Sequence, residues 1–144
     1  MSKLKLMTIV GTRPEIIRLS EVIKKCDKYF EHILVHTGQN YDYSLNQVFF
    51  EDLGLREPNY YLNVVGKDLG ETMGNIIASS YKLMCEVKPD AVLVLGDTNS
   101  AMSAISSIKT NANAPPAISI AATIPKIKTE LFILSPLLIF HLLY

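Results

Sequence analysis

The stretch IVGTRPEIIR, residues 9–18, decides the fold of this chain. It closes the run KLKLMTIV at residues 3–10, which is typical of a strand buried on both faces of a parallel sheet. Gly11 ends this strand, and Pro14 suits the first turn of a helix because its missing N–H needs no partner there. Apolar side chains then recur at helical spacing, at Ile16, Ile17, Val22, Ile23 and Cys26. The stretch therefore predicts a buried strand followed by a helix over about residues 14–29.

The same order of strand and helix repeats along the chain. Further strands are predicted at residues 32–36 (HILVH), 60–64 (YYLNV) and 91–95 (AVLVL), and further helices at 43–53, 69–87 and 101–108. The helix at 69–87 has one apolar side made of Met73, Ile76, Ile77, Tyr81 and Met84. Alternating strands and helices imply right-handed βαβ units, so we expect an α/β fold: a Rossmann-like parallel sheet with helices on both faces. Ligands of such sheets bind outside the carboxyl ends of the strands.

Two loops at these strand ends contain side chains suited to ligand binding or catalysis. GTRPE at residues 11–15 combines the arginine Arg13 with a helix N-terminus, and both stabilise anions. Alternatively, Arg13 is a surface residue and Glu15 an ordinary acid of the first helical turn. GDTNS at residues 96–100 places Asp97 and three further polar side chains after a buried strand, although one of them could simply cap the next helix. If the loops meet, an acid and an anion site lie together, as proton removal beside a phosphate leaving group requires.

A third loop, HTGQNYD at residues 36–42, offers amide and hydroxyl groups that suit sugar hydroxyls. We interpret His36 and the later His141 as structural histidines, because neither has a visible partner in the sequence. The pattern GxGxxG does not occur, so the fingerprint of dinucleotide binding is missing.

The composition narrows the class of protein. The 144 residues include 14 basic and 14 acidic side chains, which gives no broad basic surface for nucleic acid. Cys26 and Cys85 lack the spacing of metal ligands or of a disulfide framework, so we expect buried or half-buried thiols in a reducing compartment. The N-terminus has no pattern of a signal peptide, and we expect a cytoplasmic protein.

Four ordered motifs resemble the UDP-N-acetylglucosamine 2-epimerase family: GTRPE, HTGQNYD, LGETMGNII at residues 69–77 and KPDAVLVLGDTNS at residues 88–100. The wording of the motifs is most similar to the branch that serves bacterial capsule and surface-polysaccharide synthesis. The resemblance implies a glycosyltransferase-B-like fold of two Rossmann-like domains with the active site between them. It also implies elimination of UDP across C1 and C2 of the sugar and its re-addition with inverted C2, without a redox cofactor or a metal.

The resemblance also implies roles for individual residues. Arg13 would act on the phosphates or the sugar, and Asp97 would be an acid near the reacting carbon, so these two are the expected catalytic residues. The expected substrate-binding residues are Arg18, Gln39, Thr98, Asn99 and Ser100. The partner would be a UDP-sugar, with neither nucleic acid nor membrane, and full-length relatives would be able to form homodimers.

The pattern of the family breaks after Ser107. We expect residues 1–107 to be the Rossmann-like N-terminal domain, residues 108–144 to be a divergent tail or the product of a shifted reading frame, and the UDP-binding C-terminal domain to be missing. The apolar end LFILSPLLIFHLLY, residues 131–144, is shorter than the roughly 20 residues of a membrane span. A truncated, inactive epimerase is thus predicted, and the alternatives are a non-catalytic nucleotide-sugar-binding remnant and a glycosyltransferase-B-type sugar transferase domain.

Overall fold

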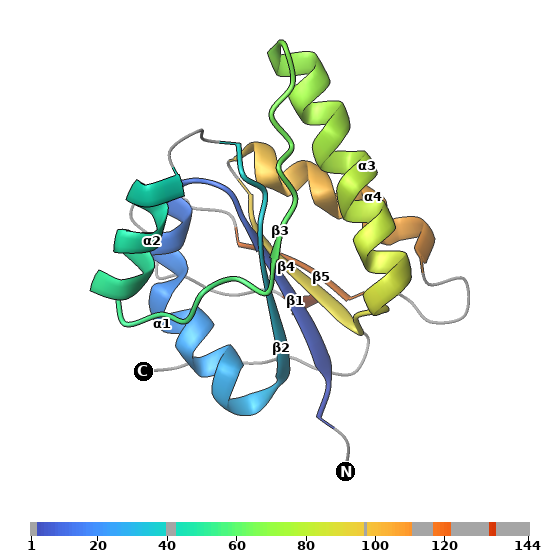
Figure 1. Ribbon diagram of the computed structural model, residues 1–144. Helices are drawn as coiled ribbons and strands as arrows, with labels where there is room; N and C mark the ends of the chain where they lie inside the picture. Colours follow the sequence, from blue (N-terminus) through green and yellow to red (C-terminus); the bar gives the residue numbers. More distant parts are fainter. Residues whose placement is uncertain (1–2, 40–42, 97, 111–116, 122–132, 135–144) are drawn as a thin grey trace.

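The computed structural model describes residues 3–39, 43–96, 98–110, 117–121 and 133–134 (Figure 1). They form one sheet of strand order β3-β2-β1-β4-β5-β6, in which every pair is parallel except β5 with β6. The strands are β1 (Lys5–Val10), β2 (Glu31–His36), β3 (Tyr60–Tyr61), β4 (Ala91–Leu95), β5 (Ala117–Ala121) and β6 (Ile133–Leu134). The helices are α1 (Arg13–Tyr29), α2 (Tyr43–Asp52), α3 (Leu69–Val87), the 3-10 helix η1 (Asn99–Met102) and α4 (Ser103–Thr110).

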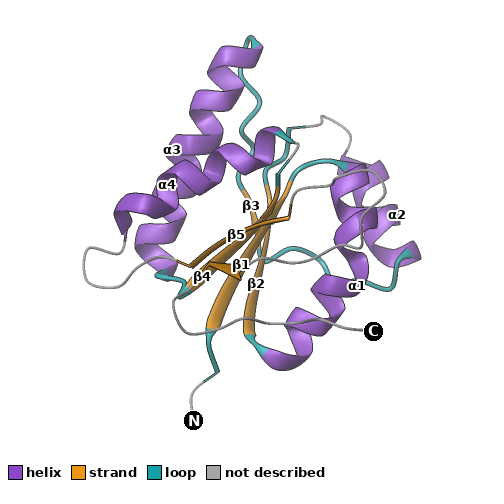
Figure 2. Cartoon of the chain, turned by 180° about the vertical axis from the view of Figure 1, so that it is seen from behind, coloured by secondary structure: helices purple, strands orange, loops and turns teal. Residues whose placement is uncertain are grey.

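The helices cover both faces of the sheet, which confirms the predicted α/β fold (Figures 1 and 2). Helices α1 and α2 lie on one face, and α3 and α4 lie on the other. Alternate side chains of β1 enter two different cores: Val10 packs with Ile16 and Phe50 on the first face, while Ile9 packs with Met84 on the second. This two-sided burial explains the continuous apolar runs in β1 and β4.

Several side chains lie elsewhere than the helical patterns predicted. Tyr81 and Ile17 are exposed at 45% and 48%, and Cys85 is also exposed, so the prediction of two covered thiols is wrong for Cys85. The buried stripe of α3 instead passes through Ser80 and Leu83. Ser80 is tolerated there because its hydroxyl donates a hydrogen bond to the carbonyl of Ile76, one turn earlier.

The predicted strand over residues 60–64 is shorter in the structure. It ends at Tyr61, and Asn63 has a φ of 50°, which lies in the left-handed region and interrupts an extended strand. The main chain nevertheless continues alongside the end of β2, because Leu62 N donates to the carbonyl of His36 and Val64 N donates to that of Thr37. This segment therefore fixes the loop that follows β2.

The sheet continues past Ser107, the predicted end of the N-terminal domain. Strand β5, which the sequence analysis did not predict, lies parallel to β4 with Val92 opposite Ile118 and Leu95 opposite Ala121. Strand β6 then pairs antiparallel with β5. Most of the remaining tail, including His141, lies outside the described residues. No helix in the described part of the chain is long and apolar enough to cross a membrane.

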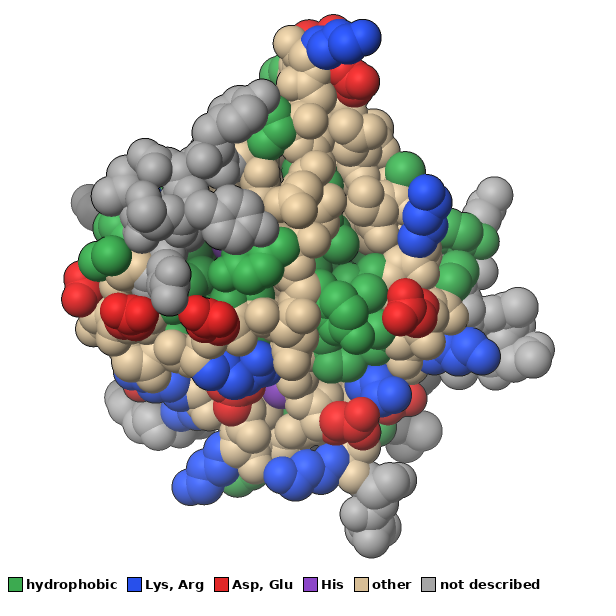
Figure 3. All heavy atoms as spheres, in the orientation of Figure 1, with side chains coloured by type: hydrophobic (Ala, Val, Ile, Leu, Met, Phe, Trp, Pro, Cys, Tyr) green, Lys and Arg blue, Asp and Glu red, His purple; other side chains and the backbone are tan. Residues whose placement is uncertain are grey.

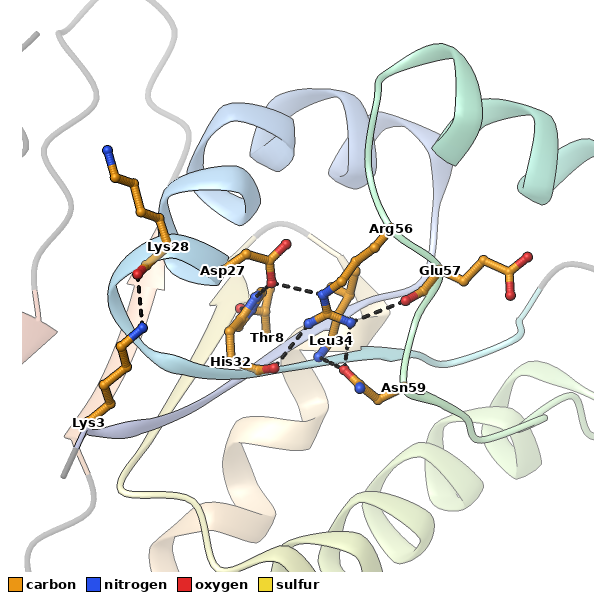
Figure 4. A network of polar contacts seen from close by, with 9 residues as sticks. All are labelled: Lys3, Thr8, Asp27, Lys28, His32, Leu34, Arg56, Glu57 and Asn59. Atoms are coloured by element: carbon orange, nitrogen blue, oxygen red, sulfur yellow. Dashed lines mark hydrogen bonds and ion pairs between the residues drawn. The ribbon is translucent and has the colours of Figure 1, made fainter.

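Charged side chains gather around the end of the molecule at which the strands begin, and at the tip between β3 and α3 (Figure 3). At the first of these places a network joins α1, the sheet and the connection after α2 (Figure 4). The ring of His32 contacts Asp27 at 2.6 Å and Thr8 at 2.7 Å. Arg56 donates to Asp27 at 2.9 Å, to Asn59 at 2.7 Å and to the carbonyl of His32 at 3.0 Å.

This network satisfies a histidine that the fold buries. The side chain of His32 is only 1% exposed, and burial lowers its pKa, although the hydrogen bond with Asp27 acts in the opposite direction. Both ring nitrogens have partners within the chain. The amino-terminal part of the sheet is thus held by a closed set of polar contacts, and we assign it a structural role.

Candidate active site

The strand order creates a switch point at the carboxyl edge of the sheet. From β1 the chain runs outward through β2 and β3, and then returns to place β4 on the other side of β1. The loops after β1 and β4 therefore lead to helices on opposite faces of the sheet, and open α/β sheets bind ligands at such a switch point. The motifs GTRPE and GDTNS occupy these two loops.

Glu15 is the centre of this edge. Its side chain is fully buried, and its Oε2 atom accepts hydrogen bonds from the backbone N–H of Gly11 at 2.9 Å and of Thr12 at 2.7 Å. The hydroxyl of Thr12 donates to the same oxygen at 2.9 Å. Thr12 is the N-cap of α1 and Glu15 is its third helical residue, so the two form a capping box.

The loop after β4 is tied to the same carboxylate. Thr98 Oγ1 donates to Glu15 Oε1 at 2.6 Å, and Ser100 Oγ donates to Oε2 at 3.2 Å. Thr98 also caps η1, but through its backbone carbonyl, which accepts from Ala101 N at 3.0 Å. The hydroxyls thus serve the contact between loops rather than the cap. The expected meeting of GTRPE and GDTNS is observed, while Asp97 itself lies outside the described residues.

The loop after β2 joins the same set. Gln39 Nε2 donates to Ser100 Oγ at 2.9 Å, so a chain of contacts runs from Glu15 through Ser100 to Gln39. The loops pack so closely around Gly11 that a Cβ atom there would lie 2.1 Å from Gln39 Nε2, 2.1 Å from Thr37 Oγ1 and 2.5 Å from Ser100 Oγ. Only glycine fits at this position.

His36, the last residue of β2, is buried beneath this edge. Its Nδ1 atom accepts from Gly38 N at 3.0 Å, and its ring lies against Tyr61 and Phe50, with centroids 5.6 and 6.3 Å away. Burial lowers the pKa of His36 from 6.5 to about 4. The ring is therefore neutral near neutral pH, in agreement with its interpretation as a structural histidine.

The remaining predicted residues lie around these contacts. Arg13 is half-buried, and its guanidinium carbon lies 5.1 Å from the ring centroid of Phe49 on α2. Arg18 is exposed on α1, and Asn99 is half-buried as the first residue of η1. Hydrogen bonds thus join Gln39, Thr98 and Ser100 with Glu15 into one cluster, whereas Arg13 packs toward α2.

Unpaired polar atoms distinguish this edge. Within the described ranges, three buried side-chain nitrogen or oxygen atoms have no hydrogen-bond partner: Arg13 Nε, His36 Nε2 and Thr37 Oγ1. All three belong to the ends of β1 and β2, the edge where Glu15 lies. Buried polar atoms are nearly always paired, so these three atoms are open to a partner from outside the chain, such as water or a ligand. The described residues contain no group of three or more His, Cys, Asp and Glu that could hold a metal ion.

The role of Glu15 is not predicted from the sequence. An ordinary first-turn acid was one of its two interpretations, but Glu15 is a fully buried acceptor for the loops after β1 and β4. A local signal was present, because the spacing T-x-x-E from Thr12 to Glu15 is that of a capping box. The partners from the loop after β4 carried no such signal, since they lie more than 80 positions away.

Comparison with known proteins agrees with the geometry. The family model described as UDP-N-acetylglucosamine 2-epimerase matches residues 24–113. A UDP-N-acetylglucosamine 2-epimerase homolog of Methanococcus maripaludis is 42% identical over 97 residues, which is 67% of this chain and 27% of the relative. The UDP-N-acetylglucosamine 2-epimerase of Methanocaldococcus jannaschii is 40% identical over 100 residues, which is 69% of this chain and 27% of the relative. The chain thus spans about 27% of the length of these relatives.

Solved structures give the same result. The UDP-N-acetylglucosamine 2-epimerase from Rickettsia bellii superposes with a TM-score of 0.71 at 50% identity, covering 81% of this chain and 30% of that one. The M. jannaschii enzyme in complex with UDP-GlcNAc and UDP gives a TM-score of 0.70 at 37% identity, covering 83% and 32%. Both neighbours share the fold that the four motifs predicted. The chain therefore belongs to the UDP-N-acetylglucosamine 2-epimerase family.

Proposed function

We propose that the carboxyl edge of this sheet is the N-terminal part of the active site of a non-hydrolysing UDP-sugar 2-epimerase. The observation that carries the proposal is the Glu15 contact set, which draws the loops after β1 and β4 together and reaches the loop after β2 through Ser100. These loops supply hydroxyls, an amide and an arginine at the switch point of the sheet. Such groups match the hydroxyls and phosphates of a nucleotide-linked sugar.

The proposed reaction inverts C2 of a UDP-2-acetamido sugar. A base removes the hydrogen from C2, its electron pair forms the C1=C2 double bond, and the C1–O bond to UDP breaks. UDP then adds back to C1 while a proton is delivered to the opposite face of C2. The bond to UDP is broken and re-formed, so no oxidant or reductant is consumed.

The chain's own residues would stabilise this reaction in two ways. Negative charge develops on the leaving UDP, where arginine and the N-terminus of α1 stabilise it, and we assign this role to Arg13 with Arg18 nearby. Asp97 is our candidate for an acid at C2. The sugar would be held by Gln39, Thr98, Asn99 and Ser100.

The substrate class is proposed from the relatives. One solved neighbour holds UDP-GlcNAc and UDP, and a relative from Pseudomonas aeruginosa, 38% identical over 101 residues, is a UDP-2,3-diacetamido-2,3-dideoxy-D-glucuronate 2-epimerase. We propose a UDP-2-acetamido sugar for this chain and a place in surface-polysaccharide synthesis in the cytoplasm. We further propose that the whole protein forms a homodimer.

The test uses UDP-N-acetylglucosamine with the purified chain in D2O. Binding is followed by calorimetry, UDP release by chromatography, and deuterium uptake at C2 by NMR. Deuterium uptake would support an epimerase, and binding without uptake would support the alternative of a nucleotide-sugar-binding domain without turnover. The proposal fails if the sugar nucleotide does not bind at about 1 mM, the weak end of specific affinity.

Arg13 offers a matched pair of variants for the charge role. Arg13→Ala should weaken binding of free UDP far more than Arg13→Lys, because lysine keeps the positive charge. The loss for alanine should reach about tenfold, equivalent to one charge-assisted hydrogen bond. Equal losses for the two variants would contradict a simple charge role for Arg13.

A further inference from the structure

The contacts of Glu15 determine the direction of a chain of hydrogen bonds. Within the described residues, its two oxygens face five donors: two backbone N–H groups and three hydroxyls. The buried carboxylate therefore acts as an acceptor only. The hydroxyl of Ser100 therefore has to donate its single hydrogen to this carboxylate.

This requirement fixes the hydroxyl of Ser100. Its hydrogen is directed to Glu15 Oε2 at 3.2 Å, so Ser100 Oγ can offer only its lone pairs to other neighbours. Gln39 approaches the same oxygen at 2.9 Å. A side-chain amide that meets an acceptor must present its NH2 group, because its carbonyl would face another acceptor. The Nε2 atom of Gln39 accordingly points at Ser100, and Oε1 is turned away from it.

We propose that Glu15 is a positioning residue that, through Ser100, orients the amide of Gln39 so that Oε1 accepts a hydrogen bond from the sugar of the bound nucleotide. The chemical class of the ligand group is a donor, either a hydroxyl or the N–H of an acetamido group. This inference rests on the proposed function, since that function supplies the sugar. It adds a specificity that the site otherwise lacks, because a freely rotating amide would serve donors and acceptors equally.

The orientation can be tested without a ligand. In the free chain, nuclear Overhauser effects should connect the Nε2 hydrogens of Gln39 with the β hydrogens of Ser100. Glu15→Gln should keep these effects, because three donors around the Oε2 position hold the amide oxygen of the variant there. Nε2 hydrogens that lie away from Ser100 in the unmodified chain would overturn the proposal.

Two substitutions of Gln39 give an independent test, because the proposal predicts which of the two variants is less stable. Gln39→Glu cannot donate to Ser100, whose hydrogen is held by Glu15, and it adds a second carboxylate nearby. Gln39→Met is similar in size and adds no acceptor. This relay, the chain of hydrogen bonds from Gln39 through Ser100 to Glu15, predicts that the Glu variant unfolds at a lower urea concentration than the Met variant. The reverse order would show that the hydroxyl of Ser100 is free to turn, and would overturn the relay.

The contact with the sugar is tested by measuring binding of UDP-N-acetylglucosamine. UDP, which lacks the sugar, is the control ligand. Gln39→Met should bind the sugar nucleotide about tenfold more weakly, as expected for one lost hydrogen bond, and should bind UDP unchanged. Equal affinity of the Met variant and the original chain for the sugar nucleotide would overturn the contact with sugar. No binding by the original chain would instead overturn the proposed function, and the urea order would still decide whether the relay exists.

Discussion

Acidification should destabilise this chain through His36. Its ring is 1% exposed, packs against Phe50 and Tyr61, and accepts a hydrogen bond from Gly38 N. Burial lowers its pKa from 6.5 to about 4, so the folded state resists a proton that the unfolded chain accepts readily. The free energy of unfolding therefore keeps its full value above pH 6.5, where the ring is neutral in both states. It decreases as the pH falls from 6.5 toward about 4, because only the unfolded chain binds the proton there.

The size of the effect follows from the two pKa values. Between about pH 7 and about pH 5, proton binding to the unfolded state should lower the free energy of unfolding by about 2 kcal/mol. Carboxylates also begin to titrate near the lower value, and His32 contributes in the same direction because burial lowers its pKa too. A variant of His36 is therefore needed to isolate the contribution of this ring.

His36→Asn is the suitable variant, because its side-chain oxygen can accept the hydrogen bond that Gly38 N donates to Nδ1. Lost packing lowers its stability at every pH, but it has no titrating ring. Urea unfolding at about pH 7 and at about pH 5 should show a decrease that is about 2 kcal/mol smaller in the variant than in the original chain. All other titrating groups are common to both proteins. Equal decreases would refute a buried, neutral His36.

Substitutions at three positions, Gly11, Glu15 and Thr37, probe the carboxyl edge. Gly11→Ala should lower the free energy of unfolding by about 1–3 kcal/mol, since its Cβ atom would lie 2.1 Å from two side-chain atoms. Gly74→Ala in α3 is its control, with nothing within 4 Å, and should raise stability by about 0.5–1 kcal/mol in the same urea titration. Glu15→Ala should lower the free energy of unfolding by about 3 kcal/mol or more, because it leaves buried donors unpaired. Glu15→Gln should lower it less, and calorimetric melting should show this order of the two variants. Thr37→Val removes an unpaired buried oxygen and should leave the melting temperature equal or higher, while a large decrease would show that the hydroxyl has a structural partner.

The sequence predicts the order of strands and helices well, because local patterns determine it. The run AVLVL has to be buried on both faces, and it forms β4 in the centre of the sheet. Helical spacing is less decisive, because the buried stripe of α3 includes Ser80 and leaves Tyr81 at the surface. A serine that pairs with its own helix cannot be distinguished by residue type from one that faces water.

Contacts between distant loops are the part of the site that local patterns cannot supply. Thr98 and Ser100 reach Glu15 across 83 and 85 positions of the chain, and only the strand order brings them together. Strand β5 was missed for a related reason, since five residues, AISIA, stand in a stretch without a matching motif. Their partner is β4, which the sequence places far upstream.

Similar polar groups lie at the amino ends and at the carboxyl ends of the strands, but their roles differ. Around His32, both ring nitrogens and the guanidinium of Arg56 find partners within the chain, so this network gains its full stabilising effect from folding alone. At the carboxyl ends of the strands, within the described part of the chain, Arg13 Nε, His36 Nε2 and Thr37 Oγ1 have no hydrogen-bond partner. Each unpaired buried group costs about 1–3 kcal/mol. Under the proposed function, a bound sugar nucleotide would supply the missing partners of Arg13 and Thr37, whereas His36 keeps its structural role.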